Sequence, residues 1–416
     1  MNSQHPPDSL GGDEDFEASR PGLISAAFLL AIGINLGFGV VLFMLLTSMA
    51  VFAVSEFAVG HTAAGFASSS FVVGTVVARC FAGKYVDLWG RGRTVALSLM
   101  VFVLCSGAYL LVNDYEVLVV LRMIHGAAMG FGHTALNAGV FSLIPRSRRG
   151  EGAGYYTTAN SLPQALGPLL GLQLSHVLGF DAVFVSATVI ASAALVMGLL
   201  IQLPEISVRR QQLRYQFALK PEDIIDRQAL PVAMVALLTS AAFGPVLTFL
   251  DSFSQSEGME NIASLYFLIF AATVLLTRLF IGRIQDRFGD NAALYPALVS
   301  FVVSLALLAG VPHEVGILLS AILAGVGNGA MLPVLQAIIA SAVAAKRISI
   351  GISTLYIVAD TGLGLSPLVM GLLVEISGYR LMFAVGAGLI LAGLVLYWFL
   401  HGRYDVRQGY RRRPHS

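Results

Sequence analysis

Apolar stretches of about 20 residues recur along the whole of this chain, and a helix of that length crosses the hydrocarbon core of a bilayer. Charged residues make up 12% of the chain, whereas a soluble domain has roughly 25%. The sequence therefore predicts an all-α polytopic membrane protein. Its twelve expected transmembrane helices lie at 23–52, 61–82, 93–112, 116–139, 152–174, 181–203, 229–251, 262–281, 291–309, 315–339, 350–375 and 380–400.

A polar motif occurs twice in this apolar chain. The residues Arg79, Gly83, Asp87 and Gly90 return, each 199 residues later, as Arg278, Gly282, Asp286 and Gly289. The same offset relates Gly126 to Gly325, Arg148 to Arg347 and Pro168 to Pro367. A constant register over so many positions indicates an internal duplication.

The duplication predicts two bundles of six helices each. We expect an N-terminal bundle at 23–203 and a C-terminal bundle at 229–400. A charged linker at 204–228 joins them, and polar tails at 1–22 and 401–416 flank them.

Lysine and arginine gather on one set of the predicted loops. The even-numbered loops, the linker and both tails carry nearly all of them, and Arg380 is the one that falls on the opposite side. This bias marks the cytoplasmic face of a membrane protein. We therefore expect a multi-pass protein of the cell (inner) membrane with both termini in the cytoplasm. A net charge of +1 indicates no nucleic-acid partner.

The sequence predicts neither a cofactor nor a metal site. It contains no Gly-x-x-x-x-Gly-Lys-Ser/Thr stretch, so we do not expect this chain to use ATP directly. Cys80 and Cys105 lie in apolar runs without the spacing of metal ligands, as small buried hydrophobic residues do.

The first copy of the duplicated motif, Gly83-Lys84-x-x-Asp87-x-x-Gly90-Arg91-x-Arg93, resembles the loop 2–3 signature of the major facilitator superfamily. The resemblance covers essentially the whole chain. It implies two six-helix bundles that rock about a central binding site for a small molecule, with the lipid bilayer as surroundings. It also implies transport rather than enzymatic catalysis, and a monomer.

We interpret the two motifs as conformational latches. Asp87 could bind the positive start of the helix near Ile350 while Arg79 supplies a second charge pair. By symmetry, Asp286 and Arg278 would face the start of the helix near Gly152.

The remaining members of the latches are Gly83, Gly90 and Arg91 in the first copy, and Gly282 and Arg287 in the second. Contacts of this kind exist only while the cytoplasmic side is closed, so they would favour the outward-open state. The alternative is that these charges only fix the topology and stay solvated.

Three residues are candidates for proton coupling. Arg122 begins a segment that resembles the second motif of the family, and in proton-coupled members the matching Arg is thought to tune a protonatable neighbour. His133 lies on the same stripe of that helix. Asp360 is a carboxylate ten residues into its predicted helix, where ionisation is costly. The alternatives are an Arg122 that reaches the headgroups, and structural roles for His133 and Asp360.

Polar amides in the predicted helices are candidates for the substrate cavity. These residues are Asn35, Asn137, Asn328 and Gln336. Asn137 and Gln336 are repeat partners, on helices that line the path in this family.

Gly167, Pro168 and Gly171 partly resemble the family motif that marks antiporters, although Pro163 and Leu172 replace two of its glycines. Small residues would let helices 5 and 8 pack closely, and Pro168 would bend helix 5. The alternative is ordinary packing of small residues.

These observations favour proton-coupled efflux of a small amphipathic drug or metabolite, a class that includes metal-chelating metabolites. One alternative is a proton-coupled importer of a small solute such as a sugar or an organic acid. It would usually need more fixed charge in the cavity. A membrane enzyme or a non-transporting receptor is a further alternative. Against the enzyme, no nucleophile–base constellation stands out, and against the receptor, both latch motifs are retained.

Overall fold

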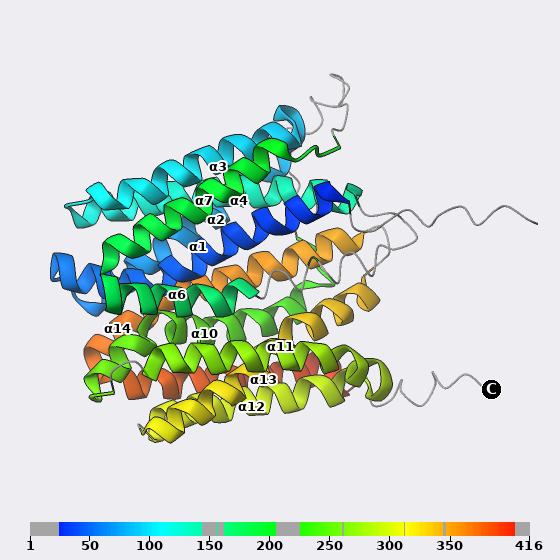
Figure 1. Cartoon of the computed structure of the whole chain (residues 1–416). Helices are drawn as coiled ribbons and strands as arrows, with labels where there is room; N and C mark the ends of the chain where they lie inside the picture. Colours follow the sequence, from blue (N-terminus) through cyan, green and yellow to red (C-terminus); the bar gives the residue numbers. More distant parts are fainter. Residues whose placement is uncertain are drawn as a thin grey trace, which may run out of the picture.

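The structure is a computed structural model that describes residues 25–143, 156, 162–204, 225–259, 262–311, 313–343 and 347–403. At 80, 83–85, 87, 88, 141, 142, 165, 348 and 349 it describes the backbone alone. Within these ranges the regular secondary structure is helical, with no strand. This confirms the prediction of an all-α fold (Figure 1).

Eleven long helices make up the described part of the chain. The first six form the N-half: α1 (Ala26–Phe57), α2 (His61–Trp89), α3 (Arg91–Ala108), α4 (Tyr115–Leu143), α6 (Leu162–Leu178) and α7 (Phe180–Leu200). The other five form the C-half: α10 (Leu230–Ser256), α11 (Ile262–Phe288), α12 (Asp290–Gly310), α13 (Glu314–Ala342) and α14 (Ile348–Tyr397).

Ten helical stretches in the described residues are long and apolar enough to cross a membrane. Helix α6 falls just outside this set because its described part has 17 residues. Helix α14 counts once, although Gly378 interrupts it with a non-helical backbone at φ 78°. Adding α6 and dividing α14 at Gly378 gives the twelve helical segments that the sequence predicts.

The duplication is visible in the backbone as well as in the sequence. Gly90 and Gly289 have φ values of 89° and 91°, a region that favours glycine, and each directly precedes a new helix. Gly179 and Gly378 repeat the pattern at 85° and 78°. In both pairs the two glycines lie 199 residues apart. The same sharp connections therefore occur at matching places in the two halves.

Helix α2 is longer than the sequence predicts. It continues through Gly83 and ends at Trp89, so the chain turns at Gly90 instead. Helix α11 likewise continues past Gly282 to Phe288. Most of the duplicated motif is therefore the last part of a helix, because a single glycine lowers helix stability without ending the helix.

The two halves meet along α2 and α14, at an interface that we call the α2–α14 seam. In Figure 1 the N-half occupies the upper part of the view and the C-half the lower part. A Cβ atom added to Gly65 would clash with the backbone carbonyl of Pro367, and one added to Gly364 would clash with Val72. Glycine is needed at both positions because the two helices approach so closely.

Contacts along the seam show that α2 and α14 run antiparallel. Thr62 contacts Glu375 at one end, and Arg79 contacts Asp360 farther along. These 17 residues of α2 correspond to about 25 Å at the rise of an α-helix. We call the end at Thr62 the α1–α2 end, because it carries the connection between those helices, and the opposite end the α2–α3 end.

The small residues of α6 pack against α1. A Cβ added to Gly167 would lie 2.6 Å from the Cβ of Phe43, and one on Gly171 would lie 2.8 Å from the carbonyl oxygen of Met44. Pro168 is buried inside the same helix. The two glycines therefore face α1. Helix 5 also contacts helix 8, which is α11, but the nearest neighbours of these two glycines are on α1.

Asp226 ties the start of α10 to the start of α14. One carboxylate oxygen accepts hydrogen bonds from the backbone N–H groups of Gln228 and Ala229, at 2.8 and 3.2 Å. The other accepts one from Nε of Arg347 at 2.6 Å. The hydrogen bond from Arg347 holds the pKa of Asp226 below its ordinary value, although burial opposes this effect.

Candidate functional site

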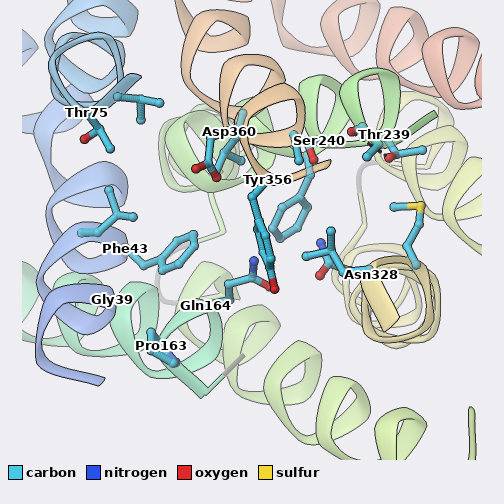
Figure 2. A pocket seen from close by; sticks show the side chains of 18 of the residues that line it. Gly39, Phe43, Thr75, Pro163, Gln164, Thr239, Ser240, Asn328, Tyr356 and Asp360 are labelled. Carbon is cyan, nitrogen blue, oxygen red and sulfur yellow. Dashed lines mark hydrogen bonds between the residues drawn. The ribbon is translucent and has the colours of Figure 1, made fainter. Parts of the chain in front are cut away.

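A cavity lies between the two halves at the level where the seam reaches Arg79 and Asp360. Its volume of about 140 Å³ is several times what one water molecule needs. Most of its wall is apolar, and polar side chains from several helices punctuate that wall. Figure 2 shows Phe43, Gln164 and Tyr356 converging from three different helices. This composition is typical of small-molecule sites.

An ion pair across the seam forms the charged part of the cavity. The guanidinium of Arg79 on α2 donates a hydrogen bond to the carboxylate of Asp360 on α14. Their side chains are 14% and 30% exposed, and both line the cavity. The sequence predicts a latch role for Arg79 and a proton-coupling role for Asp360. The structure places the two in a single contact.

His133 extends this contact into a polar network within the N-half. Its Nδ1 lies 3.3 Å from Nη2 of Arg79 and 3.3 Å from the amide nitrogen of Asn137, which are both donors. Its Nε2 lies 3.0 Å from the amide oxygen of Asn35. These partners assign a neutral imidazole that accepts at Nδ1 and donates from Nε2 to Asn35.

Two tyrosines that the sequence analysis missed support the amides at corresponding places in the two halves. Tyr156 donates a hydrogen bond to Asn137 at 2.6 Å, and Gln336 donates one to the hydroxyl of Tyr356 at 2.7 Å. Tyr356 lines the cavity, as do Asn35 and Asn328. Asn137 and Gln336 do not line the cavity themselves. Each contacts a residue that does, His133 for Asn137 and Tyr356 for Gln336. The offset of 199 residues that relates Asn137 to Gln336 places Leu355, and not Tyr356, opposite Tyr156. The sequence repeat therefore does not identify the two tyrosines as a pair.

Arg278, the repeat counterpart of Arg79, also lines the cavity. Its Nε is buried and has no hydrogen-bond partner among the described residues. No carboxylate in the described ranges forms a salt bridge with it.

Arg122 lies away from the cavity. It is fully buried, donates hydrogen bonds to the backbone carbonyls of Ala67 and Ser68 on α2, both at 2.9 Å, and stacks on Phe71. The contact between helices is close here, since a Cβ on Gly126 would clash with the Phe71 carbonyl. Arg122 therefore joins α4 to α2. Its full burial contradicts the alternative in which it reaches the headgroups, and its role in proton coupling stays a prediction.

The second copy of the motif makes few contacts in this structure. Asp286 and Arg287 are exposed, and Arg287 packs over the neighbouring ring of Phe288. A Cβ on Gly282 would meet nothing within 4 Å. In the first copy Arg91 is buried at the start of α3. The predicted contacts of Gly83 and the Asp87 side chain, and of the helix start near Gly152, lie outside what the structure describes.

Further contacts join the halves at the α1–α2 end. Glu375 on α14 accepts hydrogen bonds from the backbone N–H and the hydroxyl of Thr62, at 3.0 and 2.6 Å. His176 on α6 lies 3.0 Å from the carboxylate of Asp251 on α10. The first pair joins α2 to α14 and the second joins α6 to α10, so two different helix pairs connect the halves at this end. The sequence does not single out these residues, because polar residues at helix ends are common.

The sequence matches the Major Facilitator Superfamily over residues 23–313 and 229–415, which together span nearly all of the chain. The chain belongs to the Major Facilitator Superfamily. It is therefore a multi-pass membrane transporter of this superfamily, and superfamily members are generally not enzymes.

Relatives within the superfamily have similar lengths. The uncharacterized MFS-type transporter YhhS of Escherichia coli O6:H1 is 27% identical over 350 residues, which cover 80% of this chain and 82% of YhhS. The staphylopine export protein of Staphylococcus aureus is 20% identical, with 77% and 83% covered. The multidrug resistance protein MdtG of Citrobacter koseri is 26% identical, with 78% and 81% covered.

Solved structures of superfamily transporters share the fold. The nucleoside transporter NupG superimposes with a TM-score of 0.68 at 14% identity, covering 90% of this chain and 99% of NupG. The human organic anion transporter MFSD10 gives 0.65 at 18% identity, covering 89% and 98%. At such identities the likeness concerns the fold alone.

Proposed function

We propose that this superfamily transporter exports a small amphipathic drug or metabolite in exchange for protons. The observation that carries the proposal is the Arg79–Asp360 pair, which joins the two halves inside the cavity. A contact between moving halves, made by a group that can take up a proton, links protonation to conformation. Only such a differential interaction can shift the balance between two states.

Asp360 is the proton carrier in this proposal. The ionised carboxylate binds Arg79 and holds the seam together beside the cavity. Protonation removes the negative charge, so the guanidinium loses its strongest partner and the halves can separate. His133 accepts from Arg79 at its Nδ1. We therefore assign it to positioning Arg79 rather than to carrying the proton. We assign Arg122 no direct step in this pathway, because it lies between α2 and α4.

Two observations support export of an amphipathic molecule. The cavity wall is mainly apolar, which suits a substrate with a hydrocarbon part. Relatives that cover most of this chain are named a multidrug resistance protein and a staphylopine export protein.

In the proposed orientation the α2–α3 end faces the cytoplasm of a cell with an inner membrane. Arg91, Arg93, Arg283 and Arg287 lie at this end, as the positive-inside rule requires. The termini and the linker would then be cytoplasmic. A periplasmically active phosphatase fused after Gln211 is expected to stay inactive, and strong activity would contradict this orientation.

Alternating access supplies the transport cycle of a monomer in this proposal. In the present structure the halves are fastened at the α1–α2 end by Thr62–Glu375 and His176–Asp251. The other state requires these pairs to separate while the carboxylates Asp87 and Asp286 of the two motifs engage at the α2–α3 end. The latch roles of Asp87 and Asp286 belong to that other state.

Transport by the full chain in proteoliposomes tests the proposal. Three dansyl compounds serve as probes: N-dansylglycine is an anion, N-dansylglycinamide is neutral and N-dansylethylenediamine is a cation. We expect at least one probe to accumulate when the lumen is acidic, because outward proton movement then drives it inward. Accumulation only with an alkaline lumen would indicate proton-coupled import instead. Uptake equal to that of protein-free liposomes under both gradients would contradict transport of this class.

A further inference from the structure

Arg278 differs from its repeat counterpart Arg79 in one respect. Arg79 pairs with Asp360, whereas Arg278 lines the same cavity with a buried Nε that has no hydrogen-bond partner in the described structure. The repeat offset places Ser161 where Asp360 would have its equivalent. The N-half therefore lacks the carboxylate that would complete the symmetry at this position.

The charged residues in the cavity lining do not balance. They are Arg79, Arg278 and Asp360. The pair of Arg79 with Asp360 leaves the guanidinium of Arg278 without a compensating carboxylate among the residues that the structure describes. An unpaired charge away from bulk water is costly, and one at membrane depth by default faces a functional cavity. A bound anion would remove this cost.

We infer that Arg278 binds an acidic group, such as a carboxylate, on the transported molecule. The planar guanidinium presents paired donors that match the two oxygens of a carboxylate. Leu42, Phe43, Val72, Met129 and Phe243 line the same cavity and provide an apolar surface for the rest of the molecule. The substrate class is therefore an amphipathic anion. This inference rests on the proposed transport through the cavity and makes that proposal more specific.

Binding of the three dansyl probes tests the inference separately from transport. The full chain in lipid nanodiscs is dialysed to equilibrium against N-dansylglycine, N-dansylglycinamide or N-dansylethylenediamine, with empty nanodiscs as the blank. The probes share one aromatic group and differ mainly in charge. We expect the wild type to bind the anion at least about tenfold more tightly than it binds the neutral amide. This preference should disappear in Arg278→Gln and return in part in Arg278→Lys, which keeps the charge but loses the paired donors.

Arg283→Gln is the matched control, because Arg283 is exposed on the same helix and does not line the cavity. It should keep the wild-type preference for the anion. The inference is overturned if Arg278→Gln also keeps that preference, or if it loses all three probes equally, as a purely structural or latch role would cause. It is also overturned if the wild type binds the probes alike or binds none of them. A protein that shows the charge preference but moves no probe would leave the inference standing and contradict the transport proposal.

Discussion

The Asp360→Asn variant is expected to lose proton-driven accumulation while it still exchanges substrate across the membrane. Asparagine has nearly the same shape but cannot alternate between a charged and a neutral form. Hydrogen bonds to charged groups contribute about 1.5–3 kcal/mol, which corresponds to roughly 10- to 100-fold in an equilibrium. We therefore expect gradient-driven accumulation of the transported dansyl probe to fall about tenfold or more, with counterflow without a gradient largely retained.

Asp181→Asn provides the matched control for this experiment. Asp181 is exposed in the first turn of α7 and does not line the cavity. The same change of side chain at that position should leave accumulation at the wild-type level. Full gradient-driven accumulation by Asp360→Asn would show that the proton is carried elsewhere.

A covalent link between the halves at the α1–α2 end is expected to stop transport completely. Cysteines replace Thr62 and Glu375, which are in hydrogen-bond contact in this structure, in a background where Cys80 and Cys105 are alanine. A short bifunctional thiol reagent then fixes the seam. Because the other state requires this contact to open, flux should fall to that of protein-free liposomes, and reduction of a reducible linker should restore it.

The matched control links two residues at the same end within one half. Glu257 and Arg380 both belong to the C-half and form a salt bridge at 3.0 Å. Cysteines at these positions should cross-link as readily without stopping transport, because the halves remain free to move. Transport that continues at full rate with the Thr62–Glu375 link in place would contradict alternating access through this end.

The sequence predicted the features that depend on local composition and on the repeat. Apolar stretches of membrane length gave the helices, and the offset of 199 residues correctly matched the glycines with positive φ. Helix ends were less predictable. Gly83 suggested an end, but α2 continues to Trp89, because the polar residues after Gly83 are compatible with a helix at a membrane surface.

Contacts between distant residues were not predictable from the pattern. Arg79 and Asp360 are 281 residues apart and belong to different halves, so the sequence suggested separate roles for them. The stripe on helix 4 suggested that Arg122 and His133 share a site. The structure separates them: Arg122 binds backbone carbonyls of α2 and His133 reaches the cavity. The sequence shows which residues share a helix face, but it does not show which neighbouring helix or cavity that face contacts.

The asymmetry between the halves also required the structure. The sequence showed Arg79 and Arg278 as equivalent members of two latches. In the structure both line one cavity, and of the two only Arg79 has a described carboxylate partner. Asp87 lies on the part of α2 that follows Arg79. The structure does not describe the side chain of Asp87, so its latch role stays a prediction.

Proton movement inside proteoliposomes provides the decisive comparison between the wild type and Asp360→Asn. A trapped pH-sensitive dye reports the lumenal pH after the transported dansyl probe is added outside acid-loaded vesicles. We expect entry of the probe to alkalinise the lumen with the wild type and to leave it unchanged with Asp360→Asn. If the probe enters through the wild type without any change in lumenal pH, or if both proteins move protons equally, then Asp360 does not couple this transport to protons.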